Sequence, residues 1–139
     1  MMSLYFSIVV PVYNRPEEVN ELLQSLEEQE FTDDFEVVIV EDGSSERSDA
    51  VVDRFKKNLN VSYYFKPNSG PGDSRNFGMQ KAKGNYFIIL DSDCILPPQY
   101  LVEVEKELNA NFVHCFGGPD AAHASFTIVQ KAINYVMTS

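Results

Sequence analysis

Short apolar runs alternate with segments of helical period along this chain, and this alternation constrains the fold more than any other feature. Residues 6–12, 35–40, 61–65, 86–90 and 112–116 are predicted strands, because they are short, largely apolar and bounded by turn residues. The run at 35–40 is rich in β-branched side chains. Such runs are typical of strands that are covered on both faces, as in parallel sheets.

The segments between these strands predict helices. Pro16 suits the first position of a helix, and Glu17 and Glu18 suit the positive end of its dipole. Ser44 or Ser45 is the expected cap of the second helix. The predicted helices cover residues 16–29, then 44 or 45 to about 57, then 70–83, 98–109 and 122–137.

This order of elements predicts an α/β fold with a three-layer α/β/α sandwich and a mostly parallel, doubly wound sheet. A chain of 139 residues has room for one such domain, which we expect to span residues 1–139. In sheets of this kind ligands bind beyond the carboxyl ends of the strands. The residues that follow each strand are therefore the candidates for function.

Composition excludes some classes of protein. The net charge of −10 comes from 21 acidic and 11 basic residues, which disfavours binding to nucleic acid. The sequence contains neither an apolar stretch of about 18 residues nor a signal peptide, so we expect a cytoplasmic protein. Cys94 and Cys115 belong to no spaced motif and are interpreted as reduced core residues.

Polar and acidic residues follow three of the predicted strands. Asn14 follows the first, Asp42 the second, and Asp91-Ser92-Asp93 the fourth. Asn and Asp are also common turn and cap residues, so Asn14 alone carries little weight. Asp91 and Asp93 are two apart in an extended chain, so their carboxylates point to the same side. Two such charges about 4 Å apart repel by about 4 kcal/mol at an effective dielectric of about 20, which a hard cation such as Mg²⁺ or Mn²⁺ relieves.

The segment at 68–78 combines glycines with a cation. Gly70 and Gly72 let backbone approach a ligand and lead into a predicted helix, whose N-terminus attracts anions. Arg75 lies in the first turns of that helix, within reach of a phosphate. The first strand is followed neither by Gly-x-Gly-x-x-Gly nor by a P-loop, which disfavours both nucleotide fingerprints.

Four motifs in order resemble the family-2 glycosyltransferases of the GT-A fold. They begin at Val9, Val38, Gly72 and Gly84, and read VVPVYN, VIVEDGSS, GDSRNFG and GNYFIILDSD. The resemblance extends over about residues 6–118. It implies the Rossmann-like, nucleotide-sugar-binding half of such an enzyme, which transfers a sugar with inversion in polysaccharide or glycoconjugate synthesis.

The resemblance also implies roles for individual residues. Pro11 and Tyr13 would border the base and ribose, and Asp42 would accept a hydrogen bond from the base. Arg75 would contact the base or diphosphate. Asp93 would ligate a Mg²⁺ or Mn²⁺ ion that acts as Lewis acid for the leaving nucleoside diphosphate, with Asp91 on the ribose or a metal-bound water. The full predicted site consists of Pro11, Val12, Tyr13, Asn14, Asp42, Gly72, Arg75, Asp91 and Ser92 for the nucleotide sugar, and Asp93 with Asp91 for the metal.

The C-terminal part departs from the family. Family members carry a second half with the acceptor site and an acidic general base. Asp120, the only acidic residue after the predicted fifth strand, is the one candidate for this base, but we expect a domain that is truncated before the acceptor half, with the base outside it. The donor would be of UDP or GDP type and the acceptor a saccharide or a lipid-linked molecule. Any membrane association, at the inner face, would come from regions outside this chain.

Three alternatives stay open at this point. The chain is a donor-binding fragment without turnover, a nucleotidyltransferase, or a phosphoacceptor receiver domain. A nucleotidyltransferase usually has a glycine-rich, basic loop after the first strand, where this chain has Tyr13-Asn14-Arg15. A receiver domain needs a lysine after the fifth strand, where Gly117-Gly118-Pro119 stands instead.

Overall fold

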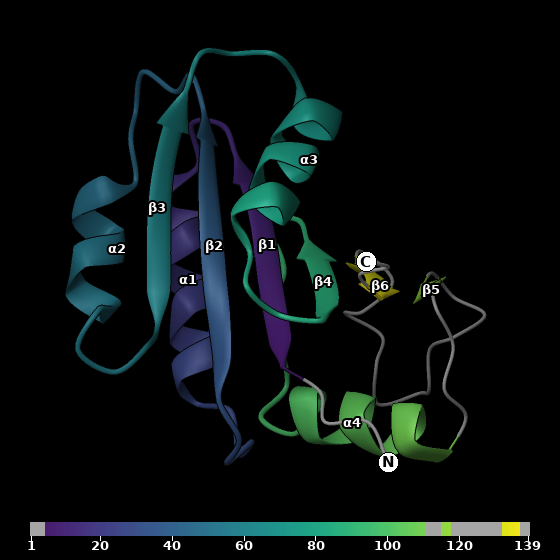
Figure 1. Cartoon of the computed structure of the whole chain (residues 1–139). Coiled ribbons are helices and arrows are strands. Elements are labelled where there is room, and N and C mark those ends of the chain that lie inside the picture. Colours follow the sequence, from purple (N-terminus) through teal and green to yellow (C-terminus); the bar gives the residue numbers. More distant parts are fainter. Residues whose placement is uncertain (1–4, 111–114, 118–131, 137–139) are drawn as a thin grey trace.

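The computed structural model describes residues 5–110, 115–117 and 132–136. Its centre is a six-stranded sheet in the order β3-β2-β1-β4-β6-β5 (Figure 1). The strands are β1 (Phe6–Val12), β2 (Phe35–Asp42), β3 (Val61–Lys66), β4 (Tyr86–Leu90), β5 (Cys115–Gly117) and β6 (Ala132–Val136).

The first four strands are parallel. β1 lies between β2 and β4, so that Val9 faces Val38 on one side and Ile89 on the other. β3 pairs with the outer side of β2. Because all four strands run in one direction, their carboxyl ends meet at one edge of the sheet. The predicted α/β fold with a mostly parallel sheet is confirmed.

The last two strands differ from the prediction. β6 runs antiparallel to β4 and pairs with β5 on its other side. The helix predicted at 122–137 is therefore wrong for residues 132–136, and its other residues lie outside the described ones. A short apolar run fits either period, and here pairing with the open edge of β4 decides for a strand. Of the strand predicted at 112–116, residues 115 and 116 lie in β5 and the rest are outside the described residues.

Helices cover both faces of the sheet, as the predicted three layers require (Figure 1). Apolar side chains of three helices, such as Leu22, Val52 and Val104, share one large core with Phe6 and Ile8 of β1. These three helices are α1 (Pro16–Glu27), α2 (Asp49–Phe55) and α4 (Tyr100–Ala110). On the other face, a smaller core around Val9 packs against the remaining helix, α3 (Pro71–Lys81).

α3 packs closely on the sheet although it is a polar helix. Its buried residues are the small Ser74 and Gly78. A Cβ at Gly78 would lie 2.4 Å from Cγ1 of Val9 and 3.1 Å from Cγ2 of Val40, so glycine permits this approach. This packing fixes the N-terminal end of α3 at the carboxyl edge of the sheet.

α2 begins later than predicted. Its N-cap is Ser48, whose side chain makes no capping hydrogen bond, so the predicted cap at Ser44 or Ser45 is wrong. The hydroxyls of Ser44 and Ser48 instead donate to the carboxylate of Glu41, at 2.5 and 2.9 Å. A buried carboxylate competes successfully for these donors because charged acceptors make the stronger hydrogen bonds.

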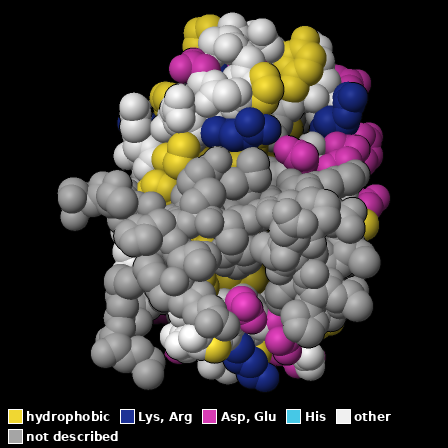
Figure 2. Space-filling model, turned by 90° about the vertical axis from the view of Figure 1, so that its right-hand side faces the viewer, with side chains coloured by type: hydrophobic (Ala, Val, Ile, Leu, Met, Phe, Trp, Pro, Cys, Tyr) yellow, Lys and Arg dark blue, Asp and Glu magenta, His cyan; other side chains and the backbone are white. Residues whose placement is uncertain are grey.

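Acidic and basic side chains are interspersed on the described part of the face in Figure 2, rather than segregated into blocks of one sign. None of the helices among the described residues is long and apolar enough to span a bilayer.

Candidate functional site

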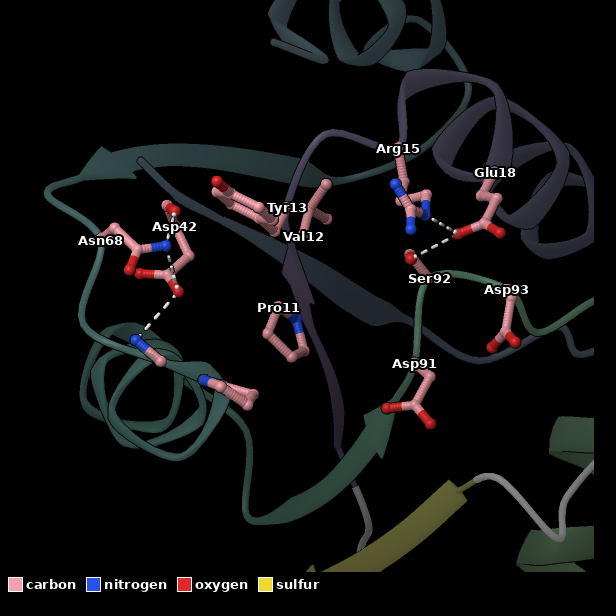
Figure 3. A pocket seen from close by; sticks show the side chains of 12 residues that line it. Pro11, Val12, Tyr13, Arg15, Glu18, Asp42, Asn68, Asp91, Ser92 and Asp93 are labelled. Atoms are coloured by element: carbon pink, nitrogen blue, oxygen red, sulfur yellow. Dashed lines mark hydrogen bonds and ion pairs between the residues drawn. The ribbon is translucent and has the colours of Figure 1, made fainter. Parts of the chain in front are cut away.

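A pocket of about 670 Å³ opens at the carboxyl ends of β1, β2 and β4 (Figure 3). Its volume is in the range typical of sites for small molecules and cofactors. We call it the strand-end pocket. Its lining residues are Pro11, Val12, Tyr13, Arg15, Glu18, Asp42, Asn68, Gly70, Pro71, Asp91, Ser92 and Asp93.

Asp42, the last residue of β2, forms one side of the pocket. The residue is 4% exposed, and its Oδ1 accepts hydrogen bonds from Nζ of Lys66 at 2.7 Å and from the amide of Ser69 at 2.8 Å. Its Oδ2 accepts from the amide of Gly70 at 3.0 Å. Burial raises the pKa of Asp42, but the bonds from Lys66, Ser69 and Gly70 outweigh it and hold this pKa below its usual value. Asp42 is therefore an ionised carboxylate at neutral pH.

The same contacts fasten the loop between β3 and α3 to the end of β2. The side-chain amide of Asn68 donates to the backbone oxygen of Asp42 at 2.9 Å. Gly43 adopts φ +69°, and a Cβ there would lie 2.6 Å from the amide nitrogen of Asn68. Only glycine allows this backbone conformation and this close approach together. The wall of the pocket thus depends on Asp42 and Gly43.

Asp91 and Asp93 lie on the side of the pocket opposite Asp42 (Figure 3). They follow β4, and the Asp91 side chain is 51% exposed. Between them, the hydroxyl of Ser92 donates to Oε1 of Glu18 at 2.9 Å, and Nε of Arg15 lies 3.8 Å from the same oxygen. The first turn of α1 therefore holds the turn that carries both carboxylates.

Arg75 of α3 lies beside this acidic group. Its Nη2 is 3.9 Å from Oδ1 of Asp91. Its Nε is buried and has no hydrogen-bond partner among the described residues. A buried donor without a partner is costly, and the partly exposed guanidinium beside Asp91 places a positive charge next to the acidic side of the pocket.

The charges of the pocket fit a divalent cation that is shared with a ligand. Four carboxylates and one guanidinium line the pocket, a balance that repels a bare diphosphate. The described residues contain no group of three or more His, Cys, Asp or Glu side chains that could hold a metal alone. Mg²⁺ commonly takes one or two carboxylates and completes its shell with water and substrate phosphates. Asp91 and Asp93 fit this pattern.

The floor of the pocket, between its two sides, comes from the end of β1. Pro11 and Val12 contribute apolar surface, and Tyr13 is 53% exposed. An exposed aromatic ring on a fixed strand end offers a flat surface on which a base or a sugar can stack.

The strand-end pocket brings together Pro11, Val12, Tyr13, Asp42, Asp91, Ser92 and Asp93 of the predicted site. Three predicted residues do not line it. Arg75 lies beside Asp91, at 3.9 Å, and Asn14 turns toward the loop after β2, where its Oδ1 accepts from the amides of Ser45 and Glu46. A Cβ at Gly72 would meet nothing within 4 Å, so the packing requires no glycine there. Asp120 lies outside the described residues.

Sequence reasoning missed several residues of the site. The sequence predicts for Glu18 only a favourable place at the positive end of the helix dipole, whereas its carboxylate accepts a hydrogen bond from Ser92 in the turn after β4. Lys66, which ends β3, is 7% exposed, and a lysine at the end of a strand that neighbours acidic strand ends is a signal for such an ion pair. The other lining residues outside the predicted site are Arg15, Asn68, Gly70 and Pro71.

Known proteins of similar sequence are sugar transferases. The poly(ribitol-phosphate) β-N-acetylglucosaminyltransferase TarS of Staphylococcus aureus is 40% identical over 91 residues, which cover 63% of this chain and 16% of TarS. An uncharacterized glycosyltransferase of Haemophilus influenzae is 36% identical over 138 residues, which cover 91% of this chain and 44% of that protein.

Solved structures show the same fold. The crystal structure of TarS residues 1–349 in complex with UDP-GlcNAc matches with a TM-score of 0.75 and 29% identity, over 86% of this chain and 36% of that one. The mannosyltransferase PcManGT of Pyrobaculum calidifontis, in complex with GDP-Man and Mn²⁺, matches with a TM-score of 0.82 over 98% of this chain and 45% of that one. At 18% identity, this second match supports the fold alone.

The chain spans between 12% and 44% of the length of the first curated relatives that it matches. The sequence model of one family, Glycosyl transferase family 2, matches residues 7–135, which is most of the chain. With its parallel sheet and its acidic strand-end pocket, this chain belongs to glycosyl transferase family 2.

Proposed function

We propose that the chain is the donor-binding domain of a metal-dependent, inverting glycosyltransferase. The observation that carries the proposal is the arrangement of the strand-end pocket, with the ionised Asp42 on one side, Asp91 and Asp93 on the other, and the exposed Tyr13 between them. A nucleoside diphosphate sugar has the matching order of groups: a flat base, a ribose and two phosphates.

The base belongs beside Tyr13 and Asp42. The Tyr13 ring offers a stacking surface, and the Asp42 carboxylate prefers a ring N–H, which both uracil and guanine present. Asp42 already accepts several protein hydrogen bonds, so the base would share this carboxylate with the loop that it fastens. TarS, whose solved structure shares 29% sequence identity with this chain, has been crystallised with UDP-GlcNAc, which favours a UDP-type donor over a GDP-type one.

The diphosphate belongs beside Asp91, Asp93 and Arg75. Asp93, with Asp91, would hold Mg²⁺ or Mn²⁺, which when bound supplies positive charge to the leaving nucleoside diphosphate. Arg75, whose Nη2 lies 3.9 Å from Asp91, would add positive charge beside the phosphates. Ser92 would keep the two carboxylates in place through Glu18.

The acceptor and the general base belong to parts of the longer protein. TarS is a poly(ribitol-phosphate) glycosyltransferase, so its acceptor is a polymer. By analogy, the acceptor here would be a saccharide or a lipid-linked molecule in polysaccharide or glycoconjugate synthesis. We place the reaction in the cytoplasm, at the inner face of the membrane where the acceptor is lipid-linked. Asp120 is the alternative candidate for the base within this chain.

Binding of a donor without turnover is the second candidate function. It is favoured by the chain covering less than half of its relatives' length, because the acceptor side is expected in the remainder. Nucleotidyl transfer has no comparable support, since the loop after β1 is neither basic nor glycine-rich.

Titration calorimetry with UDP, UDP-GlcNAc and GDP, each with and without Mn²⁺, tests the proposal. We expect binding of a uridine nucleotide that depends on Mn²⁺ and is lost in Asp93→Asn. Asp53→Asn is the matched control, because Asp53 is an exposed acid of α2 that pairs with Lys56 away from the pocket. Absence of nucleotide binding by the unsubstituted chain would contradict the proposal. Release of UDP from UDP-GlcNAc distinguishes turnover from binding alone.

A further inference from the structure

Asn14 has an unusual backbone and side-chain environment for a residue next to the pocket. It has φ +53°, and no other non-glycine residue among the described ones has a positive φ. Its Oδ1 accepts hydrogen bonds from the amides of Ser45 and Glu46, both at 2.9 Å, and from the Ser45 hydroxyl at 3.3 Å. The carbonyl side of the Asn14 amide is therefore occupied by the loop that follows β2.

The Asn14 backbone is held by the same loop. Its amide donates to Oγ of Ser44 at 2.8 Å, and the Ser44 hydroxyl donates to Oε2 of Glu41 at 2.5 Å. Glu41 is 0% exposed, and its Oε1 accepts further bonds from the amide of Ser48 at 2.7 Å and from the Tyr63 hydroxyl at 2.9 Å. A buried carboxylate thus anchors the turn after β1 through one serine.

We infer that Asn14 is a positioning residue that sets the place of Tyr13 in the pocket and does not itself contact the nucleotide. Tyr13 lines the strand-end pocket and Asn14 does not, although they are neighbours in the chain. The contacts to the loop after β2 fix the backbone on the C-terminal side of Tyr13, and β1 fixes it on the N-terminal side. The backbone that carries the Tyr13 ring is therefore held before a ligand arrives, so that only the side-chain torsions of Tyr13 have to be ordered on stacking, which lowers the entropic cost.

This inference rests on the proposed function, because it concerns the base end of the same pocket. It predicts different effects on the two ends of the nucleotide. Loss of the Asn14 contacts should weaken the interaction with the base and leave that with the phosphates unchanged, because Asp91 and Asp93 are held by Glu18 and Ser92. A merely structural role would weaken both.

Two substitutions separate the side chain from the backbone. Asn14→Gly keeps access to positive φ and removes the Oδ1 acceptor, whereas Asn14→Asp keeps the acceptor and tolerates this backbone. We expect Asn14→Gly to weaken UDP binding in the presence of Mn²⁺ about tenfold, the size of one lost stacking interaction. Binding of pyrophosphate with Mn²⁺ should not change, and Asn14→Asp should retain UDP binding.

Tyr13→Ala completes the test. In that background, Asn14→Gly should cause no further loss of UDP affinity, because the ring that Asn14 positions is gone. An additional tenfold loss, or equal weakening of pyrophosphate, would overturn the inference.

A measurement without ligand separates this inference from the proposed function. Amide hydrogen exchange of Ser45 and Glu46, followed by NMR, should be faster in Asn14→Gly than in the unsubstituted chain. Unchanged exchange overturns the positioning role directly. If the unsubstituted chain binds no UDP, the proposed function fails whatever the exchange result, and Asn14 then has no role in binding.

Discussion

The two acidic strand ends of this pocket are built in opposite ways. At the end of β2, Glu41 and Asp42 are 0% and 4% exposed, and protein donors bind all four of their carboxylate oxygens. At the end of β4, the Asp91 side chain is 51% exposed, and Nη2 of Arg75 lies 3.9 Å from its Oδ1. Both acidic strand ends lie at the carboxyl edge of the four parallel strands β1 to β4.

The difference shows that an acidic residue at a strand end has no fixed role. After β2 the chain turns back over its own strand end, and the amides and hydroxyls of residues 44–48 and 69–70 converge on the carboxylates. After β4 the turn is held from outside, through Ser92 and Glu18. The first pair is therefore a buried part of the fold, whereas Asp91 and Asp93 of the second are exposed at the pocket.

Glu41→Ala should have the largest effect on stability. It removes the shared acceptor of Ser44, Ser48 and Tyr63 and leaves buried donors without a partner. We expect a loss of about 3 kcal/mol in the free energy of unfolding, measured in urea. A loss below about 1 kcal/mol would show that the buried Glu41 carboxylate contributes little to the stability of the fold.

Gly43→Ala should have the next largest effect. Alanine is strained at φ +69°, and its Cβ would collide with the backbone of Asn68. We expect a loss of about 2 kcal/mol, again measured in urea, together with weaker UDP binding because the Asn68 wall is displaced. Gly72→Ala is the matched control, since a Cβ there meets nothing. Equal losses in the two variants would contradict the explanation.

Acid should reveal the ion pair of Asp42 with Lys66. The pKa of Asp42 is lowered in the folded chain, so its contribution to stability is complete above the ordinary value of 3.8 and is lost as pH falls below it toward the lowered pKa. We place this effect below that of Gly43→Ala, because burial opposes the lowering. Asp42→Asn should remove this part of the pH dependence of unfolding, and an unchanged profile would contradict the assignment.

Asp93→Asn should have the smallest effect on stability, within about 0.5 kcal/mol, because it removes an exposed charge. Its effect should appear with ligand instead. Mn²⁺ and UDP together should raise the melting temperature of the unsubstituted chain and not that of Asp93→Asn. A large loss of stability without ligand would erase the contrast between the two strand ends.

The sequence predicted the framework of the fold well, because β1 to β4 and their helices are local patterns of apolar residues. Asp42, Asp91 and Asp93 were placed at one edge by the rule for parallel strands alone. The hydrogen bonds of Asn14 and Lys66 could not be predicted from the sequence, because their partners are 24 to 32 residues away in the chain. β6 was predicted as part of a helix, because its pairing with β4 is not visible in local periodicity.

The place of β6 in the sheet has a consequence for synthesis of the chain. β1 to β4 are complete once residue 90 has been made, but the outer edge of β4 pairs with a strand that begins at Ala132. At about 5–20 residues per second, the ribosome needs several seconds to make the intervening segment. During that interval β4 is the last strand of a nascent sheet, with unpaired amides and carbonyls beside the acidic turn. A ribosome that pauses there would prolong the exposure of this edge to neighbouring nascent chains.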